Sequence, residues 1–429
     1  MIETGVSLGA ARILSFARTG DPIPPPDGGR PASVAPQAPN SGMLPVFCMA
    51  LGTFAIGTEG FMIAPLLPEM AGDFLRPISS VALLVTVFTL TLAISSPILT
   101  VLTARFDRRR LLISTMVAFA IANLVAWSSQ SFTGLLIARV MLAVAAGLYI
   151  PNANALAGAI VKGELRGRAL AIVSGGMTIA IALGLPLGAM IGHAFGWRAT
   201  FFAVGVMAAV AAIGIMLGLE NGAGGGVAVP GFRQRAQVAG EPAVLKALSV
   251  SAFWSIGAFI AYPFIAPYLA STLGFGVGGI SASVSLWGVS AAAGVVIGGY
   301  LNDKLGSARV IAPMLLLLAL SFLVLSASNG LLSPTSALIP VLLAIALWGL
   351  TVWGFFPAQM AHLIAAGGLP SASVTLSLNT SVMYAGFAVG SSIGSVILAN
   401  DAIAQLGMVA AMSELVALAL FLMFRSRAA

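Results

Sequence analysis

The stretch from Val81 to Arg110 reads VALLVTVFTLTLAISSPILTVLTARFDRRR. Its first 24 residues carry no charge, and four arginines fall within its last six. A helix needs about 20 apolar residues to cross the hydrocarbon core of a bilayer. Positive charge beside a helix end marks the cytoplasmic side. This stretch therefore predicts a transmembrane helix that ends at a cytoplasmic loop.

The whole chain has the same character. Of its 429 residues, 59% are hydrophobic and 8% are charged, and the mean hydropathy is +1.04. A soluble domain carries about 25% charged residues, so this composition excludes a soluble globular protein. Open sheets leave their edge amides unpaired in lipid, and the alternation of a spanning barrel is absent. We predict an all-α membrane protein.

Twelve apolar segments are long enough to span a membrane. They lie at 44–70, 79–103, 110–130, 132–160, 166–194, 198–219, 245–271, 278–303, 309–327, 334–362, 370–397 and 402–424. Residues 1–43 are polar and rich in Pro and Gly, and we expect them to be disordered and cytoplasmic. Met43 directly precedes the first span, so it competes with Met1 as the true start.

Lys and Arg are divided unequally between the two sides of the predicted helices. One side holds 17 of the 20, the other holds Arg76 and Arg198, and Arg139 lies inside a span. This division places both termini in the cytoplasm. The net charge of +7 is then a topology signal, and we expect no nucleic-acid partner. Cys48 is the only cysteine, which excludes an internal disulfide and a Cys-based metal site.

The two halves of the chain resemble each other at offsets of about 200 residues. The matches are Ile63–Leu67 with Ile265–Leu269, Pro151 with Pro357, the glycines 184, 188 and 192 with 386, 390 and 394, and the loops 102–110 and 301–309. Two homologous six-helix halves are an architecture of secondary transporters. We expect the two glycine rows to pack helices across the interface between the halves.

This repeat divides the chain into domains. We predict a first half at 44–219, a flexible Gly-rich cytoplasmic linker at 220–244 and a second half at 245–429.

The segment from Gly299 to Arg309, GYLNDKLGSAR, resembles the G-x-L-x-D-[RK]-x-G-x-x-R loop of the major facilitator superfamily. The equivalent first-half loop departs from that pattern, because Thr100, Ala104 and Asp107 stand where Gly, Asp and Gly are usual. The resemblance covers the chain after Met43. It implies two pseudo-symmetric six-helix halves that alternate access to a central cavity.

Three further segments narrow the resemblance. GWRATF at 196–201 and LNTS at 378–381, with the degenerate first loop, are similar to bacterial sugar-efflux and arabinose-efflux permeases of the drug:proton antiporter group. GLPLG at 184–188 approximates the antiporter motif G-P-x-x-G, with Pro186 one place late. The resemblance implies an antiporter in a bacterial inner membrane.

Glu59 lies in the middle of the first span. A carboxylate at the bilayer centre costs at least about 3 kcal/mol, and burial favours the protonated form. Such a group can bind and release a proton as its exposure changes, so Glu59 is our candidate for proton coupling. The alternative is a structural carboxyl bonded to a neighbouring helix.

Arg139 and Glu414 are the other charged residues well inside spans. Arg139 matches the superfamily's arginine in span four, and we expect it to modulate the proton site or hold an anionic group. A structural ion pair or a snorkelling side chain is equally compatible with its position. Span twelve is peripheral in this fold, so for Glu414 we favour a local hydrogen bond over proton coupling.

The resemblance also implies an intracellular charge latch that stabilises the outward-open state. Its candidate residues lie in the two basic loops, and they are Arg105, Asp303, Lys304 and Arg309.

Polar and aromatic residues in spans one, four, seven, ten and eleven are candidates for contact with a solute, and each is equally compatible with an interhelical hydrogen bond or packing contact. They are Asn152, Asn154, Tyr262, Tyr268, Gln359 and Asn379. Trp353 and Met383 would add apolar walls. A few amides among aromatic and Met surfaces suit a neutral or amphipathic solute.

We therefore predict a proton-coupled secondary transporter that exports a small organic solute, such as a sugar, drug or metabolite. The alternative is an uncoupled channel, facilitator or receptor. We expect no enzymatic activity, because the chain lacks a usable nucleophile–base set, and no metal or cofactor beyond the proton gradient. The expected partners are the solute, protons and the lipid bilayer, and the expected state is a monomer.

Overall fold

The computed structural model describes residues 43–220 and 231–426, which belong to one compact unit. All regular structure in these two ranges is helical. Residues 1–42, for which we predicted disorder, and residues 221–230 of the predicted linker lie outside the described part of the chain.

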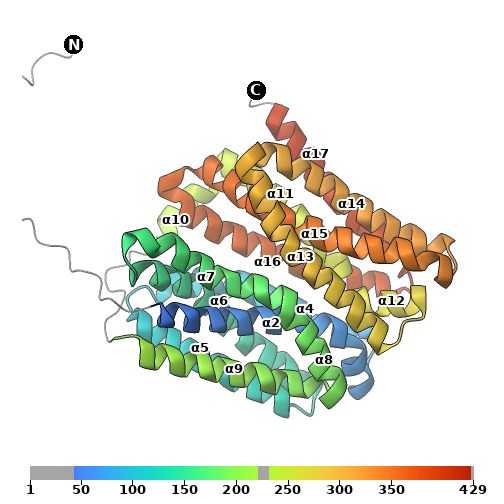
Figure 1. The fold of residues 1–429 in the computed structure, drawn as a ribbon, viewed down its shortest axis with the longest axis horizontal. Coiled ribbons are helices and arrows are strands. Elements are labelled where there is room, and N and C mark those ends of the chain that lie inside the picture. Colours follow the sequence, from blue (N-terminus) through green and yellow to red (C-terminus); the bar gives the residue numbers. More distant parts are fainter. Residues whose placement is uncertain (1–42, 221–230, 427–429) are drawn as a thin grey trace, which may run out of the picture. The chain divides into compact units, whose positions relative to one another are not determined.

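The helices form twelve candidate membrane spans, at the predicted positions (Figure 1). In the first half they are α2 (Leu44–Asp73), α3 (Ile78–Val81) with α4 (Leu83–Leu102), α5 (Arg108–Ser128), α6 (Phe132–Ala159), η1 (Gly163–Leu165) with α7 (Arg166–Ile179), η2 (Ala180–Gly184) and α8 (Leu185–Phe195), and α9 (Trp197–Gly218). In the second half they are α11 (Pro242–Ala261) with η3 (Tyr262–Phe264) and α12 (Ile265–Leu273), α13 (Val277–Leu305), α14 (Ser307–Leu331), α15 (Pro334–Gly367), η4 (Leu369–Ser371) with α16 (Ala372–Ala399), and α17 (Gln405–Ser426). The predicted all-α membrane fold is confirmed.

The described part of the predicted linker is more ordered than its composition suggests. It contains the short helix α10 (Phe232–Ala239), and α11 begins at Pro242, inside the predicted linker. Arg235 of α10 donates a hydrogen bond of 2.8 Å to the hydroxyl of Ser377 in α16. This contact ties α10 to the second half.

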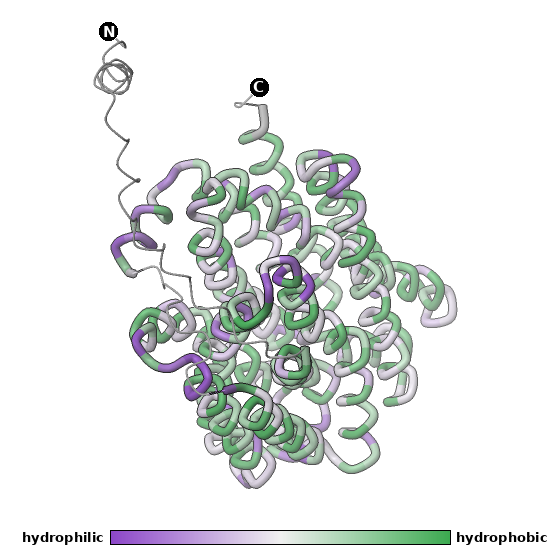
Figure 2. The backbone as a smooth tube through the Cα atoms, turned by 60° about the vertical axis from the view of Figure 1, so that its left-hand side comes forward, coloured by the Kyte–Doolittle hydropathy of each residue, from purple (hydrophilic) through white to green (hydrophobic). Residues whose placement is uncertain are grey.

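The spans run alternately up and down, so their ends gather in two groups. We call one group the basic end, and its described basic residues are Arg105, Arg108, Arg109, Arg110, Lys162, Arg166, Arg168, Arg233, Arg235, Lys246, Lys304 and Arg309. The opposite group, the far end, holds Arg76 and Arg198, and Arg198 pairs with Asp73 at 2.6 Å. Figure 2 shows hydrophobic residues along the helices and hydrophilic residues mainly in the turns that join them.

The loop between α4 and α5 explains one departure from the superfamily pattern. Asp107 is the N-cap of α5, and its side chain accepts a hydrogen bond of 2.8 Å from the backbone N–H of Arg110. An N-cap of this kind contributes about 1 kcal/mol.

The predicted role of the first glycine row is wrong. Gly184 lies against Thr58 of α2. A Cβ added at Gly188 would lie 2.8 Å from the Cβ of Met62, which is also in α2. The row therefore packs the fifth span against the first, within one half. Small residues let two helices approach closely, but the helix that this row contacts belongs to the same half and not to the opposite half.

The second glycine row repeats this arrangement within the second half. Gly390 faces the backbone of Ile256, and Gly394 faces Phe264 and the carbonyl of Ile260. The eleventh span thus packs against the seventh, as the fifth packs against the first. The repeat in the sequence corresponds to a repeated helix contact.

Two spans are interrupted near their middles. The fifth span contains a π-helical turn, η2, directly before Pro186. Proline cannot donate the helical hydrogen bond, and a wider π turn accommodates such a defect. The seventh span contains the 3₁₀ turn η3, in which Pro263 separates α11 from α12. Broken helices commonly mark the binding region of a transporter.

The two halves are joined by hydrogen bonds at positions toward the far end. The hydroxyl of Tyr262 donates to the carbonyl of Phe61 at 2.8 Å, and Thr86 donates to the hydroxyl of Ser391 at 3.2 Å. These contacts link α2 with η3 and α4 with α16. In this conformation, the two halves are therefore closed against each other toward the far end.

Candidate functional site

A fully buried ion pair lies inside the first half. Glu59 in the middle of α2 accepts a hydrogen bond from Nη1 of Arg139 in α6, and both side chains are 0% exposed. The two residues are 80 positions apart in the chain. Neither charge can be stable alone in lipid, so each accounts for the position of the other.

The second span supplies the remaining contacts of the guanidinium. Nε of Arg139 donates to the carbonyl of Leu84 at 3.1 Å, and its Cζ lies 4.1 Å from the ring centroid of Phe88. A cation over an aromatic face is stabilised by the ring quadrupole. Arg139 therefore holds three helices together: α2, α4 and α6.

The ion pair is not fully satisfied. Oε2 of Glu59 and Nη2 of Arg139 are buried without a hydrogen-bond partner in the described part of the chain. Buried polar atoms in structural networks nearly always have partners. Oε2 of Glu59 can therefore accept, and Nη2 of Arg139 can donate, a further hydrogen bond.

Two small cavities lie between the halves beside this ion pair. Each encloses about 10 Å³, and they share the side chains of Phe61, Phe259 and Phe387. Phe88, whose ring faces Arg139, lines one of them. A single aromatic ring therefore separates the ion pair from the space between the halves.

The second half contributes most of the aromatic walls. Phe61 of α2 makes edge-to-face contacts with Tyr262, at 5.6 Å between centroids, and with Trp353, at 5.9 Å. Phe259 and Phe387 stack at 3.7 Å. We call the group that lines the two cavities the aromatic cluster: Phe61, Phe88, Trp254, Phe259, Tyr262, Trp287, Trp348, Trp353, Tyr384 and Phe387.

The indoles of this cluster have unused hydrogen-bond donors. The Nε1 atoms of Trp254, Trp287 and Trp348 are buried and have no acceptor among the described residues. The three side chains come from α11, α13 and α15. All three rings line the cavity that Phe61 and Tyr262 also line.

Of the six predicted solute-contact residues, Tyr262 lines one of these cavities. Asn152 accepts from Arg108, and Asn154 accepts from Ser174 at 3.3 Å. Gln359 donates to Ala247 and Ser251 at 2.8 and 2.9 Å, and Asn379 donates to the sulfur of Met360 at 3.9 Å. These four amides form contacts between or within helices in this conformation.

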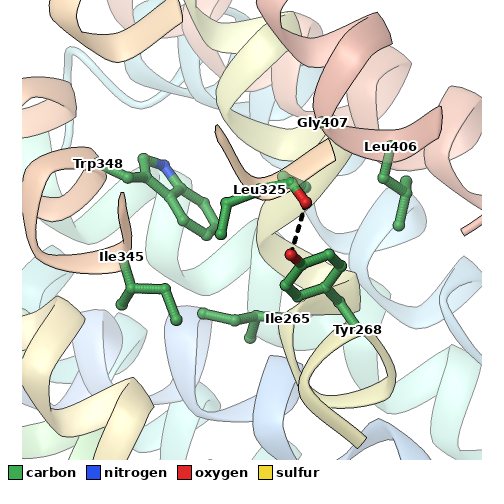
Figure 3. Close-up of a pocket in the computed structure, with 8 residues that line it drawn as sticks. Ile265, Tyr268, Leu325, Ile345, Trp348, Leu406 and Gly407 are labelled. Carbon is green, nitrogen blue, oxygen red and sulfur yellow. Dashed lines mark hydrogen bonds between the residues drawn. The ribbon is translucent and has the colours of Figure 1, made fainter. Parts of the chain in front are cut away.

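Tyr268 lies in a separate internal pocket of the second half (Figure 3). Its hydroxyl donates to the carbonyl of Leu325 at 2.7 Å, and the pocket of about 20 Å³ is bounded by apolar residues such as Ile265 and Ile345. The hydroxyl of Tyr268 is thus engaged in packing α12 against α14.

The predicted latch residues form no ion pair with one another in the described part of the chain. Asp303 accepts a long hydrogen bond of 3.5 Å from Asn302, and the ammonium of Lys304 lies 5.9 Å from the ring centroid of Tyr300. Arg105 and Arg309 lie at the basic end. The latch therefore stays a prediction for another conformation.

Glu414 differs from our expectation. It is 0% exposed, and both of its carboxyl oxygens lack a hydrogen-bond partner in the described chain. A Cβ added at Gly257 of α11 would meet this carboxyl group. The local hydrogen bond that we expected is not formed, because α17 turns Glu414 toward a glycine without a side chain.

Sequence reasoning missed most of the aromatic cluster. We searched for polar and aromatic residues and named two of its members, Tyr262 and Trp353, but not the other rings that line the two cavities. A usable signal was present in Phe61, which lies two residues after Glu59 and therefore near the same depth. The described residues contain no group of three or more His, Cys, Asp or Glu side chains that could hold a metal ion.

Comparisons with known proteins agree with this architecture. The Major Facilitator Superfamily profile matches residues 49–391. The chain is 30% identical to the uncharacterized MFS-type transporter YbcL of Bacillus subtilis (strain 168), over 89% of this chain and 96% of that protein. It is 33% identical to a chloramphenicol resistance protein of Streptomyces lividans, over 61% of this chain and 67% of that protein.

Two solved structures share the fold. A bacterial homolog of the human lysosomal transporter Spinster, in an inward-facing and occupied conformation, matches with a TM-score of 0.70 and 18% identity over 88% of this chain and 95% of its own. A mutant of the nucleoside transporter NupG matches with a TM-score of 0.72 and 10% identity over 88% and 99%. The chain belongs to the Major Facilitator Superfamily and is a multi-pass membrane transporter.

Proposed function

We propose that this transporter is a proton-coupled exporter of small, largely apolar organic solutes in a bacterial inner membrane, with its basic end in the cytoplasm. The observation that carries the proposal is the buried pair of Glu59 and Arg139 beside the aromatic cluster. The excess of basic residues at one end supports the orientation.

Protonation of Glu59 would change the charge of this site. While Glu59 is ionised, it neutralises Arg139 and the pair holds α2 against α6. When Glu59 gains a proton, Arg139 becomes an uncompensated buried cation, which costs several kcal/mol in a low-dielectric surrounding. The first half must then rearrange to rehydrate or re-pair the guanidinium.

The second span offers a route from the ion pair to the other half. Arg139 contacts Leu84 and Phe88 of α4, and α4 is bonded to α16 through Thr86 and Ser391. A movement of Arg139 that displaces α4 would disturb this contact between the halves. A solute that enters the cavity beside Phe88 would act on the same helix.

The aromatic cluster supports the solute class. Its walls are apolar rings, and its unused polar groups are indole N–H donors. Such a surface suits a neutral, flat solute that carries hydrogen-bond acceptors. Chloramphenicol has this chemistry, and the Streptomyces relative is named for resistance to it, so it is the first probe.

The test uses the full-length chain, produced in a drug-sensitive bacterium and purified into proteoliposomes. An imposed proton gradient should drive chloramphenicol transport by the wild type, and Glu59→Gln should reduce this gradient-driven transport by at least about tenfold. The matched control is Glu414→Gln, because Glu414 is equally buried but forms no ion pair in the part of the chain that the structure describes. We expect the control to retain transport.

Equal gradient-driven transport by the wild type and Glu59→Gln would refute the assignment of Glu59 as the coupling site. Transport that proceeds only down the solute gradient in the wild type would instead identify an uncoupled facilitator. A panel of other neutral aromatic compounds, tested in the same host, defines the solute if chloramphenicol is not carried.

A further inference from the structure

A second concave surface lies on the first half, away from the ion pair and the aromatic cluster. It is a groove of about 540 Å³ between the first part of α2 and the whole of α7. Phe47 and Phe54 line it from α2, while Ile172 and Ile179 line it from α7. Its volume falls within the range of about 300–1,000 Å³ that is typical of ligand sites.

The groove is open toward the lipid. Ile179, which is 51% exposed, begins a row that continues along the fifth span through Leu183, Leu187 and Met190. These residues recur every three or four positions, so they share one helix face. The later members lie toward the far end, where the halves are closed, and their large exposed apolar side chains therefore face the membrane.

Two neighbouring glycines shape the groove. Gly176 forms the floor, because a Cβ at this position would collide with the backbone of Ala50 in α2. Gly175 lies on the wall, and a Cβ there would have nothing within 4 Å. The helices thus touch at the floor, while the space above Gly175 stays open.

The groove has a cation at its basic end. Arg168 lines it there and forms no ion pair in the described part of the chain. Lys162 and Arg166 lie on the same turn of chain, against one carboxylate, Glu164. This rim carries a net positive charge at the level of a bilayer surface.

The length of the groove matches one leaflet. Ile179 lies eleven positions after Arg168, which is a rise of about 16 Å in a helix. Half of a hydrocarbon core of about 30 Å is close to this value. The groove therefore runs from the headgroup level to near the bilayer midplane.

We propose that this groove binds one anionic phospholipid, with its phosphate-bearing headgroup on Arg168 and an acyl chain along Phe47, Ile172 and Ile179. Basic pockets at the membrane surface bind acidic headgroups, and each Lys or Arg contributes about 1 kcal/mol. The apolar walls of the groove contact the acyl chain of the lipid, and the positively charged rim selects an acidic headgroup.

Native mass spectrometry of the delipidated full-length chain tests this site. The protein is titrated with dioleoylphosphatidylglycerol or with zwitterionic dioleoylphosphatidylcholine. We expect the wild type to bind one phosphatidylglycerol in preference to phosphatidylcholine. Arg168→Gln should weaken phosphatidylglycerol about fivefold and leave phosphatidylcholine unchanged.

Each variant has a matched control. Arg166→Gln removes the same charge from the same helix, but Arg166 packs against Gly158 and does not line the groove. Gly175→Leu fills the groove and should weaken both lipids, whereas Gly167→Leu, which also meets open space, should weaken neither. Equal binding of the two lipids by the wild type, or equal losses in Arg168→Gln and Arg166→Gln, would overturn the proposal.

Discussion

The two halves share a helix plan but differ in what they bury at equivalent depths. The first half buries a paired charge, Glu59 with Arg139, and keeps α2 continuous through Pro65. The second half buries stacked aromatic rings and breaks its equivalent span at Pro263. Its intramembrane acid, Glu414, forms no ion pair with a described residue. The repeat therefore conserved helix packing while chemistry diverged between the halves.

Under the proposed function, the two halves have different roles. The charged pair of the first half would respond to protons, and the aromatic cluster, which lies mostly in the second half, would contact the solute. The two meet at Phe88, which faces Arg139 and lines a cavity. The following predictions test this contrast, from the largest expected effect to the smallest.

Removal of the cation should be the most damaging change. Arg139→Leu leaves the Glu59 carboxylate buried without its partner, and such changes cost about 3–5 kcal/mol. Reversible unfolding in mixed detergent micelles measures this loss. The double variant Glu59→Gln with Arg139→Leu should recover part of it, because neither charge then remains. A loss below about 1 kcal/mol in the single variant would mean that the pair is not closed.

A methyl group added to the glycine rows should distinguish the halves. In the second half, Gly390→Ala forces a Cβ against the backbone of Ile256, which cannot rotate away. In the first half, Gly192→Ala meets the methyl groups of Leu66, which are the far end of a flexible side chain. We expect a cost of about 1–3 kcal/mol for Gly390→Ala and a smaller cost for Gly192→Ala in the same unfolding assay. A larger cost for the first-half variant than for Gly390→Ala would contradict this difference between the two helix contacts.

Loss of one hydrogen bond between the halves should have a modest effect. Tyr262→Phe removes the donor to the carbonyl of Phe61 and keeps the ring contacts. A single neutral hydrogen bond contributes about 1 kcal/mol, so the population closed at the far end should fall about fivefold relative to the open one. Labelling of a cysteine introduced near the far end, compared with the same cysteine in Tyr262→Leu, measures this shift. Unchanged labelling in Tyr262→Phe would show that the bond does not hold the closure.

Glu414→Gln should be nearly neutral for stability. A buried acid without a cation is neutral when protonated, and glutamine has a similar shape and no charge. The same change at Glu59 removes the partner of Arg139 and should destabilise the protein. Equal effects of the two substitutions on unfolding would remove the distinction between a paired acid and an unpaired one.

Much of the fold could be predicted from single stretches of sequence. The twelve spans follow from hydropathy, because lipid acts on each apolar segment separately. The repeat identified the equivalent helices, and the loop from Gly299 to Arg309 identified the superfamily. The glycine rows were recognised correctly as packing surfaces. Their spacing shows that one helix face carries only small residues, but it does not show which helix packs against that face. We therefore placed them at the wrong interface.

The candidate site was only partly predictable. Glu59 and Arg139 stood out because a charge within an apolar span is costly. Most members of the aromatic cluster did not stand out, because aromatic residues are common in apolar spans and their sequence neighbours are equally apolar. We predicted amides such as Gln359 and Asn152 as solute contacts, yet here Gln359 bonds to α11 and Asn152 bonds to α5.

Hydropathy and the distribution of Lys and Arg were sufficient to define this protein as a twelve-span membrane chain with one basic face, since both act locally along the chain. Only the folded structure shows that Glu59 pairs with Arg139 and that Phe88 lies between this pair and the cavity. It also shows that the carboxyl group of Glu414 lies against Gly257. These features join residues that are far apart in sequence. Their energies depend on desolvation and contact geometry, which exist only after the helices have packed.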